Sequence, residues 1–83
     1  MDDLLLRVIR HATQGATLRD IIAVGDYLDH SIFTVEELRE GLARLLAAGQ
    51  VMQKKGRWVI GKGKGTVPSA QDIKAAIADY LKK

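Results

Sequence analysis

A cluster of positively charged side chains in the second half of the chain is the part of the sequence best suited to chemistry. Within eleven residues it brings together five cations, Lys54, Lys55, Arg57, Lys62 and Lys64. Lysine and arginine side chains bind phosphate groups, so such a cluster is typical of a surface that contacts nucleic acid. Trp58 stands within it, and its ring could stack on a base or sugar, or could face the core while the lysines keep a hairpin from aggregating. These six residues are candidate nucleic-acid-binding residues.

The charge of the chain is divided unevenly along its length. Residues 1–49 carry a net charge of −3, whereas residues 50–83 carry +6, which together give the overall +3. A basic second half favours an anionic partner.

Other motifs that could do chemistry are incomplete. The span 56–62 fits the first seven positions of a phosphate-binding loop, but Gly63 follows where Ser or Thr would be needed for magnesium. His11 and His30 stand alone and the chain has no cysteine, so no metal site is expected. The two serines, Ser31 and Ser69, fall where loops and caps explain them. We therefore expect neither an enzyme nor a cofactor.

The helix with the clearest boundaries runs from Thr34 to Gly49. Thr34 can cap the first amides, Glu37 can reach back to the cap, and Phe33 can clasp Leu38 across it. Gly49 is the residue type that usually ends a helix. The aliphatic side chains that recur at spacings of three and four are Val35, Leu38, Leu42, Leu45 and Leu46.

Three further elements surround this helix. A first helix is predicted from Asp2 or Asp3 to about Ala12, and a second begins at a Thr17 cap and continues to about Leu28. Gly25 interrupts the buried stripe of the second helix, so we expect another backbone to pass close to it. After Gly49, residues 50–60 alternate as a tight hairpin that turns at 54–57.

The last part of the chain is predicted to be a linker followed by a helix. Residues 61–67 alternate glycine with lysine and carry little to bury, so a flexible linker or the far edge of the hairpin is expected. Ser69 then caps a helix that extends to about residue 82. Its apolar side, Ile73, Ile77, Tyr80 and Leu81, is expected to cover the first helix, or alternatively to form a homodimer.

The order of these elements resembles a winged helix-turn-helix domain. The resemblance covers about residues 3–61 and rests on three helices, of which the third ends as Leu45-Leu46-Ala47-Ala48-Gly49-Gln50-Val51 before a two-stranded hairpin. It implies a mainly α-helical fold with a small β-hairpin, in which the third helix is the recognition helix and the hairpin is the wing. It also implies that residues 13–17 form a small strand beside the wing. Proteins of this class bind DNA most often, but some bind RNA or only other proteins.

The exposed face of the third helix leaves two functions open. For nucleic acid it offers Arg39 and Arg44, but its first turns are acidic, which opposes docking against phosphates. For a protein partner it offers small alanine side chains that another element could approach closely. The carboxylates beside them would select a basic surface. The residues of this alternative are Glu36, Glu40, Ala43 and Ala47.

The whole chain of 83 residues is expected to form one domain. No apolar run approaches the length needed to span a bilayer, and the first residues are acidic where a secretory signal would be basic. We therefore expect a cytoplasmic binding module whose partner is DNA, contacted mainly through the basic hairpin, or alternatively a protein.

Overall fold

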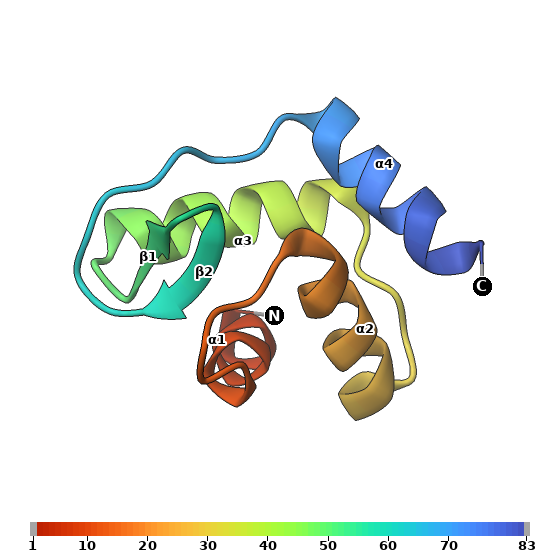
Figure 1. Cartoon of the computed structure of the whole chain (residues 1–83), viewed down its shortest axis with the longest axis horizontal. Coiled ribbons are helices and arrows are strands. Elements are labelled where there is room, and N and C mark those ends of the chain that lie inside the picture. The colour runs from red at the N-terminus through yellow and green to blue at the C-terminus, as the bar shows by residue number, and fades with distance from the viewer. Residues whose placement is uncertain (1, 83) are drawn as a thin grey trace.

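The computed structural model describes residues 2–82 and is mainly helical with one antiparallel hairpin, as the sequence predicts. The hairpin lies at one end of the third helix and the fourth helix crosses near its other end (Figure 1). None of the helices in residues 2–82 is long and apolar enough to cross a membrane. The elements are α1 Asp2–His11, α2 Leu18–Asp29, α3 Val35–Ala47, β1 Val51–Lys54, β2 Arg57–Ile60 and α4 Ala70–Leu81.

The capping box predicted at Thr34 is present, and the predicted Thr17 cap is also part of a capping box. The Thr34 hydroxyl accepts a hydrogen bond from the Glu37 amide at 3.1 Å, and the Glu37 carboxylate accepts one from the Thr34 amide at 2.9 Å. Thr17 and Asp20 make the same reciprocal pair at the start of α2. Each box satisfies two amides that have no partner inside the helix, so the starts of α2 and α3 are encoded locally.

Gly49 ends α3 as predicted. It adopts a φ of +70°, and its amide donates to the Leu46 carbonyl at 3.1 Å while the next amide, Gln50, donates to the Leu45 carbonyl at 3.0 Å. This pair of bonds is the Schellman arrangement, which uses carbonyls that the helix itself leaves unpaired. The chain leaves α3 in the direction that starts β1.

The hairpin forms with the predicted boundaries. Lys54 pairs with Arg57, and the two residues between them, Lys55 and Gly56, have φ of +54° and +77°. Positive φ at both central positions is the requirement of a type I′ turn, whose twist matches that of the strands. The expected pairing of residues 13–17 with the hairpin is also present, as a single bridge in which Ala16 and Trp58 exchange two backbone hydrogen bonds of 2.9 and 2.8 Å.

The hydrophobic core joins all the helices to the hairpin. Gly25 is buried beside it, as expected, but the group that passes close is a side chain and not a backbone. A Cβ at this position would overlap the ring of Phe33, the residue before the α3 cap. Gly25 therefore lets the ring that precedes α3 lie flat on α2. The buried core residues are Leu5, Val8, Ile9, Ala16, Ile21, Ile22, Phe33, Leu38, Leu42, Leu45, Val51, Trp58 and Ile73.

The 61–69 segment is packed against the domain, contrary to the expectation of a free linker. It runs along α3 from the hairpin to α4 (Figure 1, cyan to blue). The Gln53 amide donates to the Lys64 carbonyl at 3.0 Å, and the Gln53 side chain accepts from the Thr66 amide at 2.8 Å. A Cβ on Gly63 would meet the Met52 side chain at 2.6 Å, so glycine allows the backbone itself to lie on β1.

Helix α4 packs mainly on α2 and α3, whereas the sequence interpretation placed it on the first helix. Ile73 is fully buried, and Ile77 and Tyr80 pack against the core cluster. These side chains, proposed for a homodimer, are thus used within the chain, and Leu81 remains 61% exposed. The reason is that the 61–69 segment runs back along α3 and delivers α4 to the groove beside α2.

Candidate nucleic-acid interface

The hairpin turn, residues Lys54–Arg57, is the exposed end of the basic cluster. Lys54 and Lys55 are exposed, and the turn borders a hollow of about 370 Å³ that is also lined by Thr13 and Gln14. Cations, a hydroxyl and an amide are all groups that bind phosphate oxygens. The turn can therefore hold the backbone of a nucleic acid without reading its sequence.

Arg57 is held in place by the loop before α2. Its Nη1 donates to the Gly15 carbonyl at 3.3 Å and lies 3.7 Å from Oδ2 of Asp20, and both side chains are about half exposed. The same Asp20 oxygen accepts from the α2 cap. Part of the charge of Arg57 is therefore already compensated, and the residue fastens the hairpin to the body of the protein.

The structure contradicts the stacking role considered for Trp58. The side chain is only 1% exposed and belongs to the core cluster. It lies on the same face of the hairpin as Val51, which is also fully buried, so this face is the one turned towards the core. The alternative interpretation, a core tryptophan among surface lysines, is the correct one.

The structure separates the remaining lysines from the turn. Gly61 donates to the Gln50 carbonyl at 3.2 Å, which places Lys62 at the end of the hairpin opposite the turn. The side chain of Lys62 reaches towards Gly49, at the C-terminal end of α3, where a cation is favourable to the helix dipole. Lys64 lies between the two ends, beside β1. The five cations close in sequence thus form no single patch.

The outward face of α3 is acidic and partly covered. Glu36 and Glu40 are exposed, and Glu40 pairs with Arg44 at 3.9 Å, a surface contact of small energetic value. Arg39 and Ala43 line a hollow with residues 67–69. The 61–69 segment therefore borders the side of α3 that a recognition helix would present to a major groove.

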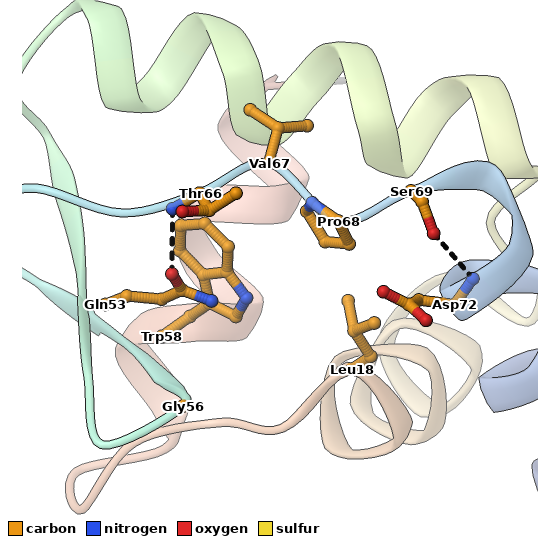
Figure 2. A pocket seen from close by; sticks show the side chains of 9 residues that line it. All are labelled: Leu18, Gln53, Gly56, Trp58, Thr66, Val67, Pro68, Ser69 and Asp72. Atoms are coloured by element: carbon orange, nitrogen blue, oxygen red, sulfur yellow. Dashed lines mark hydrogen bonds between the residues drawn. The ribbon is translucent and has the colours of Figure 1, made fainter.

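A third hollow, between the hairpin and α4, was missed by the sequence interpretation (Figure 2). It has a volume of about 440 Å³, and its floor contains the edge of Trp58. We call it the Trp58 hollow. Its walls come from β1, from Leu18 at the start of α2, from residues 66–69 and from Asp72 of α4. No sequence signal brings these four segments together, because each contributes only one to four residues from distant positions.

Comparison of the chain with models of known families, with curated proteins and with solved structures finds no match. Among residues 2–82 no group of three or more histidine, cysteine, aspartate or glutamate side chains is placed to hold a metal ion. The function must therefore be argued from the surfaces described above.

Proposed function

We propose that this protein is a non-enzymatic nucleic-acid-binding module that contacts the phosphate backbone with its hairpin turn. The observation that carries the proposal is the exposure of Lys54 and Lys55 at the hairpin turn, beside the hollow that Thr13 and Gln14 also line. At Gly56, the residue after Lys55, an added Cβ would find no atom within 4 Å. Both lysines are therefore accessible to a large ligand such as a duplex or a single strand.

We further propose that the architecture is a winged helix-turn-helix with an additional helix, α4. The order of α1, α2, α3 and the hairpin supports it, as does the bridge between Ala16 and Trp58. Within this architecture the wing, and not α3, leads binding. The acidic first turns of α3 and the 61–69 segment beside it support this assignment.

The salt dependence of binding tests the proposal. Each phosphate contact to a duplex contributes about 0.9 to the slope of log Kobs against log salt concentration. The variant with Lys54→Gln and Lys55→Gln is therefore expected to bind a short duplex with a slope smaller by about 2. Arg57 is left unchanged because it fastens the hairpin.

The matched control carries Lys74→Gln and Lys82→Gln, the same loss of charge at exposed positions of α4 and its end. It is expected to retain the slope of the unmodified protein. Equal slopes for the two double variants would show that binding depends only on net charge, and would refute the role of the turn.

A second candidate function is protein binding at the outward face of α3. The observation that favours it is the hollow in which Ala43 lies beside Val67 and Pro68, with Glu40 at its border. Exposed Glu36 and Ala47 extend the same face. A variant with Ala43→Arg would fill this hollow, and recovery of the same partner from a cell extract with and without the change would count against the candidate.

A further inference from the structure

The Trp58 hollow contains a hydrogen-bond donor without a partner. Trp58 is 1% exposed, and no residue in the described part of the chain accepts a hydrogen bond from its indole N–H. No buried side-chain nitrogen or oxygen within residues 2–82 is both shielded from solvent and unbonded. The indole N–H must therefore reach the open hollow, and Figure 2 shows the nitrogen on the edge of the ring that faces it.

A second donor stands beside the first. Gln53 lies directly opposite Trp58 in the strand register, so the two side chains are on the same face of the hairpin. The Gln53 oxygen accepts from the Thr66 amide at 2.8 Å, which fixes the side-chain amide and leaves its NH₂ group as a donor. This wall of the hollow thus offers two N–H groups to a ligand.

The opposite wall offers an acceptor. The Asp72 carboxylate lines the hollow and makes no hydrogen bond or ion pair with the described residues, although the Asp72 amide donates to the Ser69 hydroxyl at 3.1 Å. Between the two walls lie the apolar side chains of Leu18 and Pro68, whereas the side chain of Val67 points away from them towards α3. A complementary ligand has acceptors on one edge, a donor on another and apolar faces between them.

We propose that the Trp58 hollow binds one unpaired nucleobase of a single-stranded nucleic acid. A base carries ring nitrogens or carbonyl oxygens for the two N–H groups, an amino or imino N–H for Asp72, and flat faces that pack on aliphatic side chains. The volume of about 440 Å³ accommodates a base with part of its sugar.

The position of the hollow supports a nucleotide over a free small molecule. Gly56 lines its rim and is also a central residue of the hairpin turn, next to Lys55. A strand whose phosphates lie on the turn would therefore carry its bases past the opening of the hollow. This inference rests on the proposed function, and it adds that the protein prefers unpaired strands to fully paired duplexes.

The experiment compares two single-stranded probes of ten nucleotides, one with normal bases and one with abasic sugars at its central positions. Both carry the same phosphates, so contacts to the hairpin turn are equal. The normal probe is expected to bind about five- to tenfold more tightly, the effect of one or two hydrogen bonds between neutral or singly charged groups. Trp58 is the single tryptophan of the chain, so its fluorescence should change with the normal probe and not with the abasic one.

Two variants test whether the difference in affinity between the probes arises in the Trp58 hollow. Trp58→Phe keeps a buried ring but removes the N–H. Asp72→Asn removes the negative charge and replaces one accepting oxygen by an NH₂ donor, without touching the core. Each should weaken binding of the normal probe several-fold and leave the abasic probe unchanged. Glu36→Gln is the matched control for Asp72→Asn, because it also removes a carboxylate from the first turn of a helix and lies away from the hollow.

The outcomes separate the two proposals. Equal affinities for the two probes, with no change in Trp58 fluorescence, would overturn the base site and leave phosphate binding by the turn in place. Absence of salt-dependent binding for both probes would overturn the proposed function and the base site together. If Trp58→Phe does not fold, the probe comparison and Asp72→Asn still decide.

Discussion

The hairpin turn and the outward face of α3 differ in charge and in how the rest of the chain surrounds them. The turn is basic, and a Cβ added at Gly56 would meet nothing within 4 Å. The α3 face begins with Glu36 and Glu40, and the 61–69 segment lies along its border. In this chain the apolar stripe of the third helix lies in the core, and part of its outer side borders the 61–69 segment.

Charge reversal on the two surfaces should give the largest difference. Lys54→Glu with Lys55→Glu replaces two attractive contacts by two repulsive ones, so affinity for a duplex at low salt should fall by about a hundredfold. Glu36→Lys with Glu40→Lys changes the net charge by the same amount in the opposite sense. It should raise affinity by no more than about threefold, because exposed charges away from the contact are screened.

Fluorescence anisotropy with a labelled duplex, at two salt concentrations, measures both variants. A gain on α3 as large as the loss on the turn would mean that α3 faces the nucleic acid. The α3 face, and not the hairpin turn, would then be the main contact surface, and the 61–69 segment would have to move when the protein binds.

Alanine substitutions of two glycines test the difference in packing between the start of α3 and the hairpin turn. Gly25→Ala forces a Cβ into the buried ring of Phe33, and the overlap should outweigh the gain in helix propensity, for a net loss of about 2 kcal/mol. Gly56→Ala meets no atom, but its φ of +77° is unfavourable for alanine and should cost about 1 kcal/mol. For a domain of this size each kcal/mol lowers Tm by roughly 4–8 °C.

Thermal unfolding checks these two values, and a double-mutant cycle identifies the cause. Phe33→Leu should cost less in the Gly25→Ala protein than in the unmodified one, since the smaller side chain relieves the overlap. Additive effects would show that the ring is not the group that glycine accommodates.

The parts of this fold that could be predicted are those encoded within a few residues. Thr34 and Glu37 are three positions apart, and Lys55-Gly56 is a two-residue turn, so residue type and spacing were enough. Trp58 was ambiguous because a four-residue strand exposes one face and buries the other, and its neighbour on the same face is the polar Gln53. Only packing against residues distant in the sequence decides which face turns inward.

The 61–69 segment escaped prediction for a different reason. Its glycines and lysines have no apolar side chains to bury. The segment packs through its backbone instead, which lies against Met52 and Gln53. Amino-acid composition describes side chains only, so it gives no indication that a backbone will pack against a strand. The Trp58 hollow was missed as a consequence, because one of its walls is this segment.

Removal of helix caps should lower the stability by less than Gly25→Ala does, and by different amounts in α3 and α4. Thr34→Ala removes one hydrogen bond of a reciprocal box at the start of α3 and should cost about 1 kcal/mol. Ser69→Ala removes the corresponding cap bond at the start of α4 and should cost less, because α4 has one buried residue whereas α3 has four. Chemical denaturation of the two variants measures the difference, and equal losses would mean that the value of a cap does not depend on how deeply its helix is buried.

The smallest effect concerns the attachment of α4 to α2. The Tyr80 hydroxyl donates to Oδ2 of Asp26 at 2.7 Å, and this hydrogen bond to a carboxylate, with partial desolvation, raises the pKa of Tyr80 above its usual 10.0. A raised pKa in the folded state means that the contribution to stability is complete below the unfolded pKa and is lost as pH rises through the folded pKa. Stability should therefore decline above about pH 10.

The two tyrosines of the chain provide the control for this decline. Tyr80→Phe should remove its part of the pH dependence, whereas Tyr27→Phe, at a side chain that is 79% exposed, should keep it. Denaturant unfolding between about pH 9 and pH 11 measures the free energy of unfolding of both variants. The titration of the lysines affects both equally, so it cancels in the difference between them. Identical pH profiles would show that the hydrogen bond between Tyr80 and Asp26 adds nothing to the attachment of α4. The helix would then be held by Ile73 and its apolar neighbours, together with the ion pair between Arg19 of α2 and Asp79 of α4.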